Sequence, residues 1–244
     1  MRLGDNLSNY GYSPIALPRT AMDSASIMAL GRQMQRIHLG GGHISDTDIL
    51  AFALWSDSIA GASEAATLLI EHFGSLPEVL SANPYQLFAL SGLDEGVADQ
   101  VIALRLAAER YAHSRVTSGR SVLSCWGELL DYLHVTMAFE RIEQFRILFL
   151  DKKNRLIADE VQQHGTIDHT PVYPREVIRR ALELGATALI FVHNHPSGDP
   201  TPSAADIQIT QTLCEACRHL NIRVHDHVVI AKAGHTSFRD MKLL

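Results

Sequence analysis

Apolar residues recur at helical spacing through residues 41–112 of the chain. Ser45 or Asp46 can cap the helix of DTDILAFALW, because short polar side chains accept the first free backbone N–H groups of a helix. Ser63 can cap EAATLLIEHF in the same way, and further short apolar segments follow, separated by Gly, Ser and Pro. The pattern predicts a compact all-helical domain over residues 41–112, preceded by a mobile lead-in over residues 1–40.

The period changes after residues 113–122, a polar segment that we expect to be a linker. Helix-like segments then alternate with strand-like ones. The expected helices are GELLDYLHVTMAF, PREVIRRALELG and ADIQITQTLCEACRHLN, and the expected strands are RIEQFRILFLD, LIADEVQQHGTI, ATALIFV and IRVHDHVVIA. This alternation over residues 123–244 predicts an α/β (α+β) fold, in which helices flank a mixed sheet.

The composition, with 46% hydrophobic and 20% charged residues among 244, is ordinary for a soluble globular protein of one large or two small domains. No run of about 18 apolar residues is present, so we expect no membrane segment, and residues 1–20 lack the apolar core of a secretory signal. The three cysteines suggest no disulfide framework, which favours the reducing cytoplasm. Cys214 and Cys217 form a C-x-x-C within a helical pattern, where two buried thiols are a better interpretation than zinc or redox chemistry.

The charge distribution bears on DNA binding. The net charge is −6, and residues 1–120 hold eight arginines, no lysine and twelve acidic residues, so the helical half lacks a broad positive field for phosphate. The segment FGSLPEVLSANPYQLFALSGLDEGVADQV resembles a helix-hairpin-helix module, but Gly92-Leu93-Asp94 replaces the usual Gly-x-Gly turn. A carboxylate at Asp94 would oppose a DNA phosphate. A helical packing or protein-interaction module is therefore favoured, while a weak DNA contact stays open.

Two histidines, a serine and an aspartate fall within HNHPSGDPTPSAAD, residues 193–206, directly after the strand-like ATALIFV. Side chains alternate across a strand, so His193 and His195 should point the same way. Asp206, in the first turn of the following helix, can supply a third ligand once the loop folds back. Two imidazoles and one carboxylate suit zinc held tetrahedrally with its fourth position open.

A simpler alternative treats Ser203 and Asp206 as a helix capping pair, with two structural histidines before them. The joint pattern favours the metal site, because a capping serine needs no co-facing histidines on the preceding strand. The loop PSGDPTP is also stiff and pre-shaped by its prolines. Nucleobase deaminases and helical zincins are excluded, since H-x-E with P-C-x-x-C and H-E-x-x-H are both absent.

The string H-x-H-x₇-S-x-x-D at these positions resembles the JAMM (MPN+/JAB1) metalloprotease motif. Together with YPREV at 173–177 and DHVVI at 226–230, it makes the chain similar to the RadC family. The similarity covers most of residues 40–244 and is strongest over 145–240. It implies a JAMM/JAB1-MPN-like domain at 123–244, preceded by a helix-hairpin-helix-like region.

The resemblance also implies roles for individual residues. Zinc would be held by His193, His195 and Asp206. Ser203 would donate a hydrogen bond to the developing oxyanion. Glu160, in IADEVQQHGT, is the candidate general base for the attacking water, and an exposed hairpin glutamate is the alternative for this position.

Other residues attract attention without a firm role. His225 and His227 form a second H-x-H, which we expect to pack near the site or to face solvent, because no further ligand is evident beside them. His164 and His169 could line a substrate groove. Arg175, in the first turn of a helix, could pair with a carboxylate or a substrate, because its charge opposes the helix dipole.

The leading hypothesis is a zinc-dependent JAMM-type hydrolase that cleaves a peptide or isopeptide bond in a peptide or protein substrate. The alternative is a DNA-repair-associated accessory protein that binds DNA or a repair partner, and a salt-dependent shift of labelled DNA would support it. A non-catalytic module with a structural zinc site is a third hypothesis. Three recognised ligands count against it, since structural zinc sites are normally closed by four.

Overall fold

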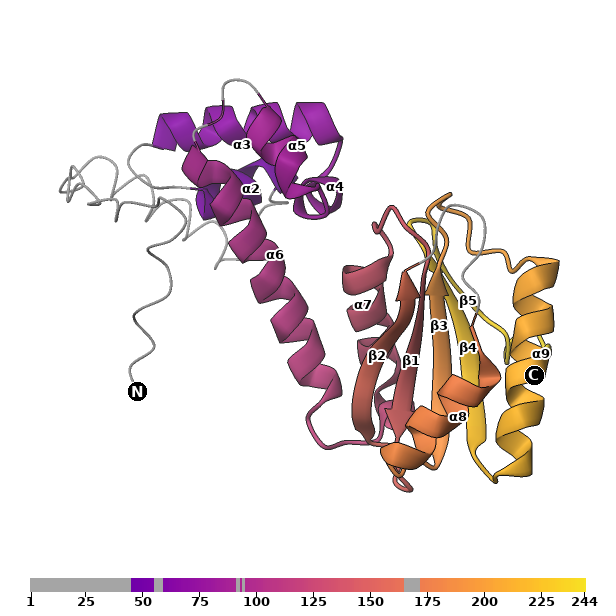
Figure 1. Cartoon of the computed structure of the whole chain (residues 1–244). Coiled ribbons are helices and arrows are strands. Elements are labelled where there is room, and N and C mark those ends of the chain that lie inside the picture. Colours follow the sequence, from indigo (N-terminus) through magenta and orange to yellow (C-terminus); the bar gives the residue numbers. More distant parts are fainter. Residues whose placement is uncertain (1–44, 55–58, 91–92, 94, 165–171) are drawn as a thin grey trace, which may run out of the picture. The chain divides into compact units, whose positions relative to one another are not determined.

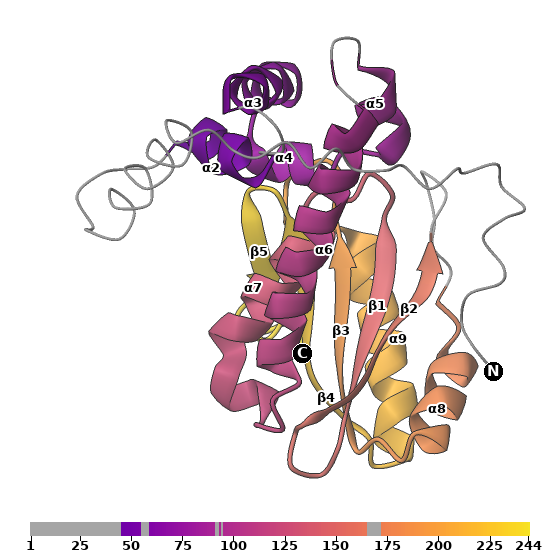
Figure 2. The ribbon, with the colours of Figure 1, turned by 90° about the vertical axis from the view of Figure 1, so that its left-hand side faces the viewer.

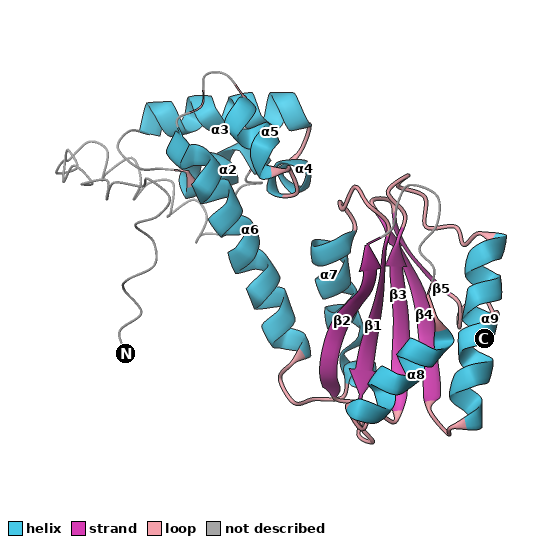
Figure 3. Ribbon diagram, viewed as in Figure 1, coloured by secondary structure: helices cyan, strands magenta, loops and turns pink. Residues whose placement is uncertain are grey.

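The computed structural model describes five parts of the chain: residues 45–54, 59–90, 93, 95–164 and 172–244. The chain divides into two compact units, residues 1–68 and 69–244. Among the described residues, only helices precede the first strand (Figure 3). Within the described residues, no helix combines the length and the apolar character needed to cross a membrane.

The first helices are α2 (Asp46–Ala53), α3 (Ile59–Phe73), α4 (Leu76–Leu80), α5 (Pro84–Ala89) and α6 (Glu95–Val116). Ser45 is the N-cap of α2, and its hydroxyl accepts a backbone N–H of the first turn at 3.1 Å. Ser63, expected to cap a helix, instead lies inside α3. The helix starts earlier because the buried Ala62, Ala66 and Leu69 continue the apolar spacing on both sides of Ser63.

The segment expected to be a linker, residues 113–122, contains the end of α6 at Val116. A short 3₁₀ turn, η2 (Val122–Cys125), leads from this segment into α7 (Trp126–Met137). Val116 and Val122 are both buried in the hydrophobic cluster that α7 forms with the sheet. These two valines therefore attach residues 113–122 to the core on the α7 face of the sheet.

The remaining elements are β1 (Gln144–Leu150), β2 (Leu156–His164), α8 (Pro174–Glu183), β3 (Ala188–Asn194), α9 (Ala204–His219), β4 (Arg223–Ala231) and β5 (Gly234–Ser237). The strand order is β2-β1-β3-β4-β5. β3 and β4 pair in parallel, and the other neighbours pair antiparallel. The expected α+β fold, a mixed sheet flanked by helices after an all-helical region, is confirmed. β5 was not expected, because its sequence GHTS has no apolar run.

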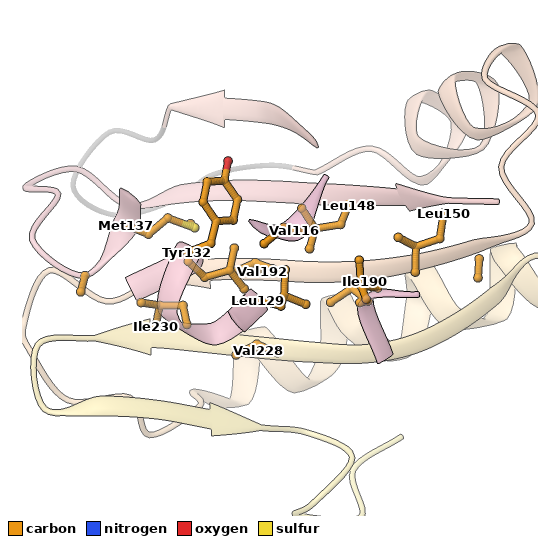
Figure 4. Close-up of a cluster of buried hydrophobic side chains, with 14 residues drawn as sticks. Val116, Leu129, Tyr132, Met137, Leu148, Leu150, Ile190, Val192, Val228 and Ile230 are labelled. Atoms are coloured by element: carbon orange, nitrogen blue, oxygen red, sulfur yellow. The ribbon is translucent and has the colours of Figure 1, made fainter. Parts of the chain in front are cut away.

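Alternating side chains of the strands build a core on each face of the sheet. On one face, Leu148 and Ile190 pack with Leu129 of α7 (Figure 4). On the other face, Ile147 and Phe191 pack with residues of α8 and α9. Figures 1 and 2 show α7 on one side of the sheet and α8 and α9 on the other. β3 is central, and all seven of its residues are buried, which explains its continuous apolar run.

The C-x-x-C pair lies on α9 and packs into the core beneath α8 and α9. Cys217 is buried and Cys214 is partly buried. Burial raises the pKa of Cys214 to about 11 and that of Cys217 to about 12. Thiols that stay protonated and lie in a core are structural, in agreement with the helical interpretation of this pair.

Candidate metal centre

The motif loop starts where β3 ends and leads to the first turn of α9, a path that can be followed in Figure 1. At its start, the His195 N–H donates to the Ile230 carbonyl of β4 at 2.8 Å. Gly198 adopts a φ of +89°, which favours glycine, and its carbonyl accepts the Ala233 N–H at 3.2 Å. These bonds to β4 and to the turn after it hold the loop in the shape that returns Asp206 to the end of β3.

Three side chains of the motif converge at this edge of the sheet. The Nε2 atoms of His193 and His195 lie 3.0 Å apart. Asp206 places Oδ1 3.4 Å from the first of these nitrogens and Oδ2 3.4 Å from the second. His193 is buried, and the side chains of His195 and Asp206 are only 16% and 14% exposed. Together they form a cluster that is compatible with a metal site.

The donor atoms and their spacing fit an ion of the size of zinc. Tetrahedral bonds of about 2.0–2.2 Å place neighbouring ligand atoms about 3.4 Å apart, close to the separations in this cluster. The Nδ1–H of His195 donates to the Asp199 carbonyl at 2.8 Å, because a carbonyl can only accept. In the neutral ring, the Nε2 lone pair of His195 is then free to bind a metal.

Ser203 caps α9 and orients the Asp206 carboxylate at the same time. Its hydroxyl accepts the Asp206 N–H at 3.2 Å, and its own N–H donates to Asp206 Oδ2 at 2.7 Å. The capping pair and the His-His-Asp cluster, which the sequence presented as alternatives, are therefore both formed. Because the cap uses only a lone pair of the hydroxyl, the Ser203 O–H remains available as a donor.

The Asp206 carboxylate dominates the electrostatics of the cluster. Burial disfavours its charge, but the neighbouring His193 and His195 imidazoles outweigh burial and hold the pKa of Asp206 well below its ordinary range. The same carboxylate raises the pKa of His195 in spite of partial burial. Asp206 therefore stays ionised near neutral pH and supplies the negative charge that attracts a cation.

The part of the chain that carries this cluster matches a known family. Residues 123–243 match the family model of the RadC-like JAB domain. These residues therefore form a RadC-like JAB domain. The resemblance stated from the motif is confirmed, and the match supports a JAMM-type relationship. We call residues 123–243 the JAB domain.

The two histidines of the second H-x-H in the JAB domain have different surroundings. His227 is fully buried beside the cluster, and its Nε2 lies 2.8 Å from His193 Nδ1. Complete burial holds the pKa of His227 well below its ordinary value, so the ring is neutral. His225 instead contacts Asn154 Oδ1 at 2.7 Å. A register shift between β3 and β4 falls at His225, and this bulge breaks the alternation that would align the pair.

Glu160, the expected general base, lies on β2 outside the cluster. Both of its carboxylate oxygens accept hydrogen bonds from the Arg180 guanidinium of α8, the shortest at 2.6 Å. In the sheet register Glu160 pairs with Ile147, which pairs with Phe191. Glu160 is thus separated from His193 by two strands across the sheet, about 10 Å, and by two residues along the strand direction, about 7 Å. The structure does not bring Glu160 to the candidate metal ligands.

Glu143, which sequence reasoning did not single out, lies nearer to the cluster. Phe145 pairs with His193 in the antiparallel ladder of β1 and β3. Glu143 directly precedes β1, and continuing this register by two residues brings it opposite His195 on the same face of the sheet. Its side chain is half-buried. Besides the larger effect of Asp206, the charge of Glu143 also raises the pKa of His195.

The other predicted positions lie outside the described residues or at the surface of α8. Gly92, Asp94 and His169 lie outside the described residues, and the side chain of His164 is not described either. The side chain of Arg175 is 81% exposed and lies 3.5 Å from the carboxylate of the next residue. The expected pairing of Arg175 with a carboxylate is present, at the surface of α8.

Proposed function

We propose that the JAB domain is a zinc-dependent hydrolase that cleaves a peptide or isopeptide bond by adding water across it. The convergence of two imidazole nitrogens and one carboxylate carries the proposal. Among the described residues, no fourth His, Cys, Asp or Glu joins this cluster. Catalytic zinc sites have three protein ligands and an open position, whereas structural sites are closed by four.

The surrounding residues supply the other parts of such a reaction. Zinc, when bound, lowers the pKa of a coordinated water to about 7 and polarises a carbonyl. We assign the general base to Glu143 instead of Glu160, because Glu143 lies opposite His195 while an arginine holds the other carboxylate. Glu143 takes a proton from the attacking water and passes it to the leaving nitrogen, so that a carboxylic acid and an amine result. The Ser203 hydroxyl donates a hydrogen bond to the oxyanion and keeps its proton.

Zinc stoichiometry tests the metal directly in full-length protein purified without a histidine tag. We expect about one zinc per chain in the wild type and none in His195→Ala or Asp206→Ala. His219→Ala is the matched control, because His219 is an exposed histidine at the end of α9, and it should keep the zinc. Wild-type protein that holds no zinc even after reconstitution would refute the proposal and leave a capped helix beside two histidines.

A further inference from the structure

We propose that Thr210 and His227 form a hydrogen-bonded relay that fixes the tautomer of His193 and thereby presents its Nε2 to the metal. The relay rests on the proposed function, since it prepares a ligand of the same centre. The three residues come from α9, β4 and β3, and at most 1% of each is exposed. Their polar atoms therefore depend on one another for hydrogen bonds.

The direction of every hydrogen bond in the relay follows from the Thr210 hydroxyl. Its single proton is donated to the Asp206 carbonyl, one helical turn earlier, at 2.5 Å. The same oxygen lies 2.5 Å from His227 Nδ1, so it accepts from an Nδ1–H. The neutral His227 ring then has a bare Nε2, which accepts from His193 Nδ1 at 2.8 Å. His193 keeps its proton on Nδ1 and a lone pair on Nε2, the atom that faces the Asp206 carboxylate.

Aromatic side chains enclose the His227 ring and hold its orientation. Phe238 stacks on it with ring centroids 4.6 Å apart. Phe145 and Phe191 meet it edge-on, with centroids at 5.5 and 5.9 Å. A phenyl ring would suit such an enclosure, and burying an imidazole there is unfavourable unless both nitrogens are bonded. The two ring nitrogens, rather than packing, therefore explain a histidine at this position.

Thr210→Val tests the relay, because it removes the hydroxyl and nearly conserves the volume. His227 then lacks an acceptor for its Nδ1–H and moves the proton to Nε2, where it must donate to His193 Nδ1. That donation forces the His193 proton onto Nε2, the ligand atom. Zinc affinity should fall about 10- to 100-fold, the range for losing an outer partner of a metal-bound histidine. Thr210→Ser restores the hydroxyl and should restore the affinity.

Thr212→Val is the matched control. Thr212 makes the same type of bond to a carbonyl one turn earlier, that of Gln208 at 3.0 Å, but it is exposed and has no histidine partner among the described residues. Zinc affinity is measured by competition with a chromophoric chelator. Long-range ¹H–¹⁵N NMR correlations of the metal-free protein report the His193 tautomer. We expect the proton on Nδ1 in the wild type, and on Nε2 or shared in Thr210→Val.

Wild-type affinity and an unchanged tautomer in Thr210→Val would overturn the relay. If that variant does not fold, His227→Gln and His227→Leu replace it, because the glutamine oxygen can accept from His193 Nδ1 and leucine cannot. Only the leucine variant should lose affinity, and equal affinities would overturn the relay. If wild-type protein binds no zinc, the proposed function fails, but the NMR tautomer still decides the relay, which a His193 proton on Nε2 would overturn.

Discussion

Substitutions of Asp206 can separate its role in the helix cap from its role as a metal ligand. Asp206→Ala removes both the acceptor for the Ser203 N–H and the carboxylate that faces the two histidines. Losing the bond from the Ser203 N–H lowers the free energy of unfolding by about 0.5–1.5 kcal/mol. Asp206→Asn keeps an oxygen that can accept the Ser203 N–H, so it should cost less in the metal-free protein.

Zinc binding adds a larger contribution to stability. At free zinc of about 1,000 times Kd, binding raises the free energy of unfolding by about 4.1 kcal/mol. For a chain of this length, that corresponds to roughly 8–16 °C in Tm. Losing an outer partner of a metal ligand weakens binding by up to about 100-fold, and losing a ligand itself should weaken it at least as much. A 100-fold weaker affinity removes about 2.7 kcal/mol of the stabilisation by zinc. Both Asp206 variants should therefore lose most of the zinc-dependent shift.

Thermal unfolding followed by circular dichroism, in zinc and in chelator, measures both contributions. Ser203→Ala is the control, because it removes the hydroxyl that accepts the Asp206 N–H but leaves the three candidate ligands in place. It should lower the metal-free free energy of unfolding by about 1 kcal/mol and keep nearly the whole zinc shift. A full zinc shift in Asp206→Asn would refute the ligand assignment, and the capping pair would then be a sufficient interpretation.

Two further predictions concern the general base and a buried carboxylate of β4. Glu143→Gln should lower zinc-dependent peptide hydrolysis by about 10²–10⁴-fold with zinc retained, and Glu160→Gln should not. Mass spectrometry measures this by counting new peptide termini with and without chelator. Loss of hydrolysis in Glu160→Gln but not in Glu143→Gln would instead assign the general base to Glu160. Asp226→Ala should lower the free energy of unfolding by about 2–5 kcal/mol, because this buried carboxylate accepts from one hydroxyl and two backbone N–H groups. Urea unfolding measures it, and a loss under about 1 kcal/mol would contradict the reasoning.

Elements that depend on local signals could be predicted from the sequence. β3 is a continuous apolar run because both of its faces are covered, and α8 begins with Pro174 at its first position. β5 depends on a partner instead, since its ladder with β4 is what makes GHTS extended. A pairing partner is a non-local property, and four residues without an apolar pattern do not reveal it.

The same distinction applies to the site. The three candidate ligands lie within fourteen residues, so strand alternation and the start of a helix were enough to group them. The sequence also held a signal that pointed to Glu143. Glu143, Phe145 and Ile147 alternate with period two, and the two apolar residues belong to the core under α8 and α9. Choosing between Glu143 and Glu160, however, requires the strand order. β1 is the neighbour of β3 and β2 is an edge strand, a fact that the local pattern does not contain.

The ligands and the relay are products of one β-α-β unit. β3 and β4 are parallel neighbours, and parallel strands need a crossover, which here is α9. This connection brings together the end of β3 with His193, the first turns of α9 with Asp206 and Thr210, and the interior of β4 with His227. The His-x-His motif alone places two imidazoles on one face. The crossover adds the carboxylate and, through Thr210, the hydrogen-bond direction that leaves the His193 nitrogen free to bind the metal.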